Sequence, residues 1–128
     1  MVISRSLKAK VGFAELHCLS NYSFLSSASH PEELVEAAAQ KGYRAIALTD
    51  ECTYSGLVKA HMAAKKHAIK FIVGSEFRVS FGTSIHEKLV LLAPNRSAYG
   101  QLAAFISKSR MKSEKGSYSA QIDDFCIG

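Results

Sequence analysis

The chain has 128 residues, of which 48% are hydrophobic and 21% are charged, and its formal net charge is +5. This composition is typical of a globular protein and excludes a disordered tail, a collagen-like chain and a disulfide scaffold. The length allows one hydrophobic core, so we expect one domain or part of one. A charge of +5 is compatible with a nucleic-acid partner but does not by itself indicate one.

The cysteines and the hydropathy pattern indicate the cellular compartment of the protein. Cys18, Cys52 and Cys126 form no C-x-x-C pair and do not resemble a disulfide framework. No segment approaches the roughly 20 apolar residues that a membrane helix needs, and the first residues lack the pattern of a signal peptide. We therefore expect a reduced, cytoplasmic protein that does not contact the membrane.

The first predicted elements are a strand over 13–17, a polar loop over 20–28 and a helix that ends near Gly42. Ser29 and Glu32 have the spacing of a capping box, and Pro31 fits the first helical turn. These signals predict that the helix begins at Ser29.

The following elements alternate between strands and helices. We expect strands over 44–50, 70–77 and 88–93, a helix over 55–67 and another helix from Pro94. The helix over 55–67 is expected to direct these side chains toward the core: Leu57, Val58, His61, Met62 and Ala64. This order predicts an α/β fold with a mostly parallel sheet.

A basic segment follows the last helix. Lys108, Arg110, Lys112 and Lys115 are accompanied by a single acidic residue, Glu114. The segment is interpreted as a solvated loop or linker, and contact with nucleic-acid phosphate is the alternative.

Chemically capable side chains follow the predicted strands. His17 follows the first strand, Asp50 and Glu51 follow the second, and Glu76 lies near the end of the third. The carboxyl ends of parallel strands meet at one edge of a sheet, and these groups could hold a divalent metal that activates water on a phosphate ester. The alternative is that they cap the following helices and turns.

Three aromatic residues lie near the same strand ends. Tyr22, Phe24 and Tyr54 are interpreted as buried anchors of the loops, and stacking on nucleic-acid bases is the alternative.

The segments 13–25, 47–51 and 69–77 resemble the amino-terminal polymerase and histidinol phosphatase (PHP) domain of bacterial DNA polymerase III alpha subunits. The resemblance extends to 91–95 and 99–107. The amino-acid sequences of 15–20, 29–34 and 49–52 are similar to those of the error-prone branch of that family. The resemblance implies a partial, distorted (βα) barrel of PHP type over 13–107, with a lead over 1–12 and a basic loop or linker and truncated end over 108–128.

The resemblance also implies the position of a metal site, but several residues of this chain differ from the ligands of metal-binding members. The H-x-H of metal-binding members keeps His17 but has Leu19 in its second place, and Ser26 stands where they have an aspartate. Glu51 replaces a histidine, Glu76 is retained, and Lys88 replaces another histidine.

These departures imply a vestigial metal site at His17, Glu51 and Glu76, without a bound cofactor. Asp50 and Lys88 would belong to a charge network that replaces the metals. Zinc or manganese is expected only if the site is not degenerate.

The resemblance implies a structural module of an error-prone DNA-directed DNA polymerase that acts in translesion synthesis and damage-induced mutagenesis. Its magnesium-dependent chemistry would lie in downstream domains. The implied partners are DNA, those downstream domains, translesion accessory proteins and the sliding clamp.

Two alternatives remain open. One is a stand-alone metal-dependent PHP phosphoesterase. The other is a non-enzymatic nucleic-acid-binding module that uses Lys108, Arg110, Lys112 and Lys115.

Overall fold

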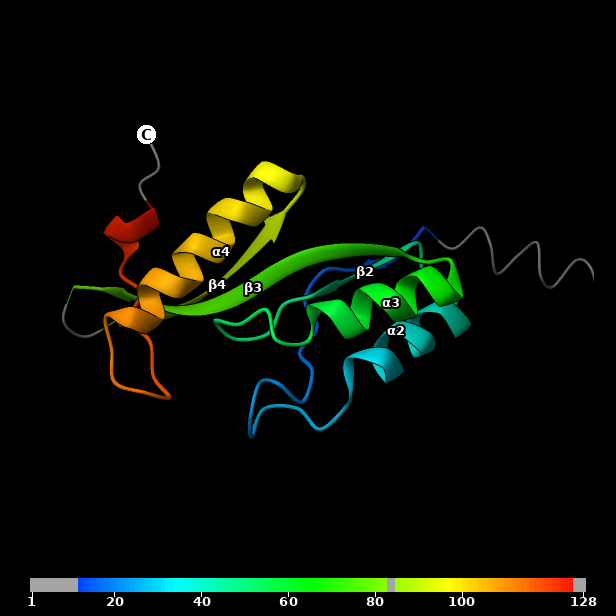
Figure 1. The fold of residues 1–128 in the computed structure, drawn as a ribbon, viewed down its shortest axis with the longest axis horizontal. Helices are drawn as coiled ribbons and strands as arrows, with labels where there is room; N and C mark the ends of the chain where they lie inside the picture. Colours follow the sequence, from blue (N-terminus) through cyan, green and yellow to red (C-terminus); the bar gives the residue numbers. More distant parts are fainter. Residues whose placement is uncertain (1–11, 83–84, 126–128) are drawn as a thin grey trace, which may run out of the picture.

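The computed structural model describes residues 12–82 and 85–125. The elements are strands β1 (Ala14–Glu15), β2 (Ala45–Leu48), β3 (Lys70–Phe81) and β4 (Ile85–Ala93), helices α2 (Pro31–Gln40), α3 (Leu57–His67) and α4 (Arg96–Met111), and the 3₁₀ helix η1 (Ile122–Phe125) (Figure 1). Most of the predicted lead and the last three residues, including Cys126, lie outside the described residues.

The four strands form one sheet in the order β1-β2-β3-β4. β1 with β2 and β2 with β3 are parallel, whereas β3 and β4 form an antiparallel hairpin. The prediction of a mostly parallel α/β fold is therefore confirmed. β3 continues to Phe81, four residues beyond its predicted end, because it pairs with β4 over this stretch.

Two apolar clusters cover one face of this long strand. Phe71 and Val73 pack in the cluster that contains α2 and α3, and Phe77 and Val79 pack in the cluster that contains Leu102 of α4. Alternate residues of a strand point to opposite faces, so the three helices lie against the same face of β3 (Figure 1). The other face of this half-barrel carries Glu76 and Arg78.

The start of α2 differs by one residue from the prediction. Pro31 is the first helical residue, so His30 rather than Ser29 precedes the helix, and the backbone N–H of His30 donates to Oε2 of Glu33 at 2.9 Å. The capping pair is displaced because the proline, which favours the first helical position, sets the helix boundary.

The predicted inner face of α3 was partly wrong. Leu57 and Ala64 are buried, but Val58 and Met62 are 74% and 61% exposed and His61 is also exposed. Ala60 and Ala63 complete the buried face instead, because small side chains let α3 approach α2 and the sheet closely.

Helix α4 extends into the predicted basic loop. The side chain of Asn95 caps the helix by accepting from the backbone N–H of Ala98 at 2.9 Å, and the helix ends at Met111. Residues 108–111 are therefore helical, and Ser109 is buried. The loop prediction was wrong for these residues because polar residues can continue a helix whose apolar face is already packed.

Candidate functional site

The carboxyl ends of β1 and β2 and the middle of β3 bring together the acidic groups and the histidine that the sequence places at predicted strand ends. An isolated parallel bridge joins Glu51 to Glu76, in which the backbone N–H of Cys52 donates to the carbonyl of Glu76 at 3.0 Å. His17, which follows β1, reaches the same place.

Glu76 is the central carboxylate of this cluster and is only 3% exposed. Its Oε2 lies 2.6 Å from Nε2 of His17, and its Oε1 lies 3.6 Å from the ammonium of Lys88. The register between β3 and β4 explains the contact of Lys88 with Glu76, because Lys88 pairs with Arg78 on the face that also carries Glu76. A histidine and a lysine thus hold the buried carboxylate from two sides.

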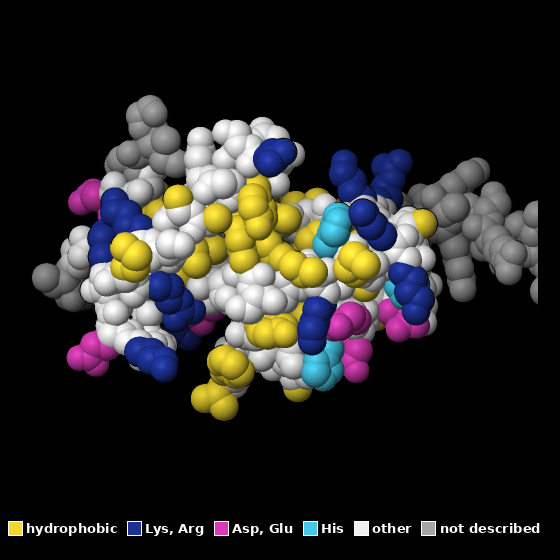
Figure 2. Space-filling view, in the orientation of Figure 1, with side chains coloured by type: hydrophobic (Ala, Val, Ile, Leu, Met, Phe, Trp, Pro, Cys, Tyr) yellow, Lys and Arg dark blue, Asp and Glu magenta, His cyan; other side chains and the backbone are white. Residues whose placement is uncertain are grey.

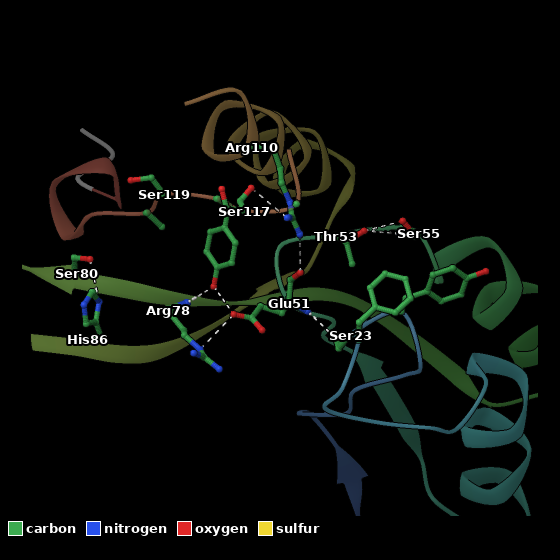
Figure 3. Close-up of a pocket in the computed structure, with 15 residues that line it drawn as sticks. Ser23, Glu51, Thr53, Ser55, Arg78, Ser80, His86, Arg110, Ser117 and Ser119 are labelled. Carbon is green, nitrogen blue, oxygen red and sulfur yellow. Dashed lines mark hydrogen bonds and ion pairs between the residues drawn. The ribbon is translucent and has the colours of Figure 1, made fainter. Parts of the chain in front are cut away.

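Glu51 has different partners. The hydroxyl of Tyr118 donates to its Oε1 at 2.7 Å, and Nε of Arg78 lies 3.4 Å from the same oxygen (Figure 3). Burial is the main cause of the raised pKa of Tyr118, so the phenol remains a hydrogen-bond donor. The charge of Glu51 is therefore compensated by Arg78 and not by Lys88.

Asp50 organises the loop that follows β1. Its Oδ1 accepts from the backbone N–H of Ser20 at 2.6 Å and from the hydroxyl of Ser23 at 2.8 Å, and its Oδ2 accepts from the hydroxyl of Ser20 at 2.6 Å. Hydroxyl and amide donors thus satisfy this buried carboxylate. Among the interactions of the described residues, Asp50 has no ion pair with Lys88.

Arg110 fastens α4 to the loop after β2. Its guanidinium donates to the carbonyls of Cys52 at 3.1 Å, Glu51 at 3.3 Å and Ser117 at 3.3 Å, and it lies 5.3 Å from the centre of the Tyr118 ring. Three of its five N–H groups are thus engaged by carbonyl oxygens that carry no formal charge.

The other members of the basic segment separate from Arg110. Lys112 pairs with Asp124 at 2.9 Å, whereas Lys108 and Lys115 are exposed. The backbone N–H of Gln121 and the ammonium of Lys112 lower the pKa of Asp124. The four predicted DNA contacts therefore lie in three different environments.

Sequence reasoning missed the roles of Arg78 and Tyr118. Strand alternation carried two residues beyond Glu76 would have placed Arg78 on the same face. Tyr118 had no comparable signal, because its contact with Glu51 spans 67 residues of sequence.

The donor set does not fit the metal cluster of metal-binding PHP domains. Within residues 12–82 and 85–125, no group of three or more His, Cys, Asp or Glu side chains is arranged to hold a metal ion. The carboxylate of Glu76 instead faces the ammonium of Lys88, which occupies space near the ligand and repels a cation.

Both described cysteines are poor candidates for ligands or nucleophiles. Burial is the main cause that raises the pKa of Cys18 and of Cys52, in each case to about 11. Thiols with such values are almost fully protonated near neutral pH, and the thiolate is the reactive form.

Fold and site together define the class: an α/β half-barrel in which ion pairs and hydrogen bonds occupy the strand ends. The profile of the PHP domain family matches residues 15–126. The chain therefore belongs to the PHP domain family, and the match includes the basic segment and η1.

The chain is also similar to longer proteins. It is 56% identical over 112 residues to an error-prone DNA polymerase of Dechloromonas aromatica and 58% identical over 110 residues to one of Methylococcus capsulatus. These alignments cover 88% and 86% of this chain and 10% of each relative. The chain thus spans about a tenth of the length of these relatives.

A solved structure supports the half-barrel. The chain superposes on an amidohydrolase from Chromobacterium violaceum, which holds a sulfate and no metal, with a TM-score of 0.63 and 33% identity over 77% of this chain and 33% of that protein. Among the described residues, no helix combines the length and apolar character needed to cross a membrane.

Proposed function

We propose that this chain acts as the PHP module of an error-prone DNA polymerase. The observation that carries the proposal is the identity of 56% over 112 residues with the Dechloromonas aromatica polymerase. An identity of this size over most of the chain supports a shared fold, so the module would occupy the same place in its parent.

The activity of the parent is DNA-directed nucleotidyl transfer, with magnesium bound by residues outside these 128. Its work would be DNA synthesis past damaged bases in the cytoplasm, with damage-induced mutagenesis as the consequence. Downstream polymerase domains, translesion accessory proteins and the sliding clamp are the protein partners.

Within that polymerase the module is structural and binds no metal cluster. His17, Lys88 and Arg78 place positive or hydrogen-bonding groups against Glu76 and Glu51. These contacts compensate the charges of Glu76 and Glu51 without a metal ion. Asp50 stabilises the site by accepting hydrogen bonds from Ser20 and Ser23 in the loop after β1, and not by an ion pair with Lys88.

A chimera tests the module. Residues 15–126 of this chain replace the matching segment of the Dechloromonas aromatica polymerase, and primer extension is measured on undamaged templates and on templates with an abasic site. We expect extension within about threefold of the parent on both templates. A soluble, monodisperse chimera that has lost all extension would contradict the proposal.

The alternative function is a phosphoesterase, and it is favoured by the 2.6 Å contact of His17 with Glu76, the two residues that the metal-binding pattern retains. It predicts hydrolysis of a nitrophenyl phosphate ester by the purified chain with added manganese. We expect none above that of a Glu76→Gln variant, because Lys88 lies against the carboxylate that would bind the metal.

A further inference from the structure

An open cleft lies between the inner face of the β3–β4 hairpin, the loop 22–24 and the segment after α4 (Figure 3). Its volume is ≈ 880 Å³, which is sufficient for more than one nucleotide-sized group. The hydrogen bonds of Asp50 hold the loop 22–24 beside the strand ends, and Arg110 holds the opposite wall. The cleft is therefore formed by segments that are tied to each other.

The charge of the cleft is positive. Two arginines, Arg78 and Arg110, and His86 line it against a single carboxylate, Glu51. Glu51 is itself engaged by Tyr118 and Arg78. In the space-filling view, Lys and Arg side chains also gather around the C-terminal end of α4 (Figure 2). Such a surface attracts anions.

Arg78 retains the capacity to bind an anion. Its side chain is 69% exposed, and its Nε lies 3.4 Å from Oε1 of Glu51. Its two terminal nitrogens carry four further N–H groups in the planar fork that suits phosphate. Lys88, the cross-strand neighbour of Arg78, lies on the same face and is paired with Glu76.

An exposed aromatic side chain stands on the rim of the same cleft. Phe24 lines the cleft and is 84% exposed, so the sequence-based interpretation of this residue as a buried anchor was wrong. A duplex already stacks its own bases, so an exposed ring can stack only on an unpaired base. Six serine and threonine residues line the remaining walls, and the hydroxyls of Ser23 and Ser117 already donate to Asp50 and to the carbonyl of Glu114.

We propose that this cleft binds single-stranded DNA, with Arg78 and Arg110 against the phosphodiester backbone and Phe24 stacked on a base. The choice of DNA over another polyanion as the ligand rests on the proposed function of the parent polymerase. The site differs from the basic segment considered in the sequence, because it includes Arg78 and Phe24 and leaves Lys108, Lys112 and Lys115 outside its lining.

The test is fluorescence anisotropy of a labelled (dT)₁₂ oligonucleotide with the purified 128-residue chain over a range of salt concentrations. Arg78→Gln is expected to raise Kd about tenfold at low salt and to reduce the slope of log K against log salt by about 0.7. Arg78→Lys should keep most of the slope, because it keeps the charge. Phe24→Ala is expected to raise Kd at least about fivefold.

Matched controls exclude general effects. Arg44→Gln removes an exposed arginine at the opposite end of β2, and Leu25→Ala truncates the fully exposed neighbour of Phe24. Both are expected to bind like the unaltered chain. Duplex DNA should bind more weakly than (dT)₁₂, because it offers no unpaired base.

Absence of (dT)₁₂ binding overturns the proposal, as does equal affinity of the Arg78→Gln and Phe24→Ala variants with the unaltered chain. If a Lys108→Gln, Lys112→Gln, Lys115→Gln triple variant alone loses affinity, the basic segment is the binding site instead. Failure of the chimera with normal cleft binding would instead contradict the proposed function alone.

Discussion

Nε2 of His17 lies 2.6 Å from Oε2 of Glu76, a contact that joins the loop after β1 to the buried middle of β3. We expect His17→Ala to lower the free energy of unfolding by about 1–3 kcal/mol, because it removes a hydrogen bond to a buried carboxylate. Urea denaturation measures the loss. His61→Ala, which truncates an exposed histidine of α3, should change stability by less than about 0.5 kcal/mol.

Metal content tests the role of Lys88. Elemental analysis of chain purified after incubation with zinc, manganese and iron should find well under one ion per chain, because the ammonium lies 3.6 Å from Oε1 of Glu76. A Leu19→His, Lys88→His double variant removes the charge and adds two imidazoles, so it should bind more metal. Two or three ions bound to the unaltered chain would contradict a vestigial site.

Arg110 holds the wall of the cleft through three backbone carbonyls. Arg110→Ala is expected to lower the free energy of unfolding by about 1.5–3 kcal/mol, because charged hydrogen bonds are lost. Arg110→Lys should retain only part of the lost stability, since one ammonium cannot reproduce the forked geometry of the guanidinium. Arg96→Ala, at an exposed position in the first turn of α4, is the control.

Gly74 is required by a close approach between β3 and its neighbours. A Cβ at this position would lie 2.8 Å from the carbonyl oxygen of Leu91 and 2.9 Å from Cγ2 of Thr49. Gly74→Ala should therefore cost about 1–3 kcal/mol of stability. Gly100→Ala in α4 meets nothing within 4 Å and should stabilise the chain by about 0.5–1 kcal/mol. Thermal unfolding compares the two.

The buried thiols predict a dependence on alkaline pH. Cys18 and Cys52 ionise near 9.0 when unfolded, but burial raises each pKa to about 11 in the folded chain. The unfolded state therefore loses protons first, and the free energy of unfolding should fall as the pH rises from about 9 to 11. Urea denaturation across this range measures it, and a Cys18→Ala, Cys52→Ala variant should show a smaller fall.

Local signals predicted most of the secondary structure and the class of the fold. The alternation of strands and helices and the family motifs were sufficient to predict a mostly parallel half-barrel. The rule that the carboxyl ends of parallel strands meet at one edge of the sheet grouped His17, Glu51 and Glu76. Predictions failed where packing overrode local pattern. The alanines of α3 displaced Val58 and Met62 from the core, and α4 continued through residues 108–111.

The amino-acid sequence by itself determined that this chain belongs with PHP domains, and it predicted that Leu19 and Lys88 stand at positions where metal-binding members have ligands. Only the tertiary structure decided which charges meet: Lys88 and His17 with Glu76, Arg78 and Tyr118 with Glu51, and serine hydroxyls with Asp50. The physical reason is distance along the chain. Motifs and helix signals are read within a few residues, whereas these partners are up to 67 residues apart and meet only through strand register and the path of α4.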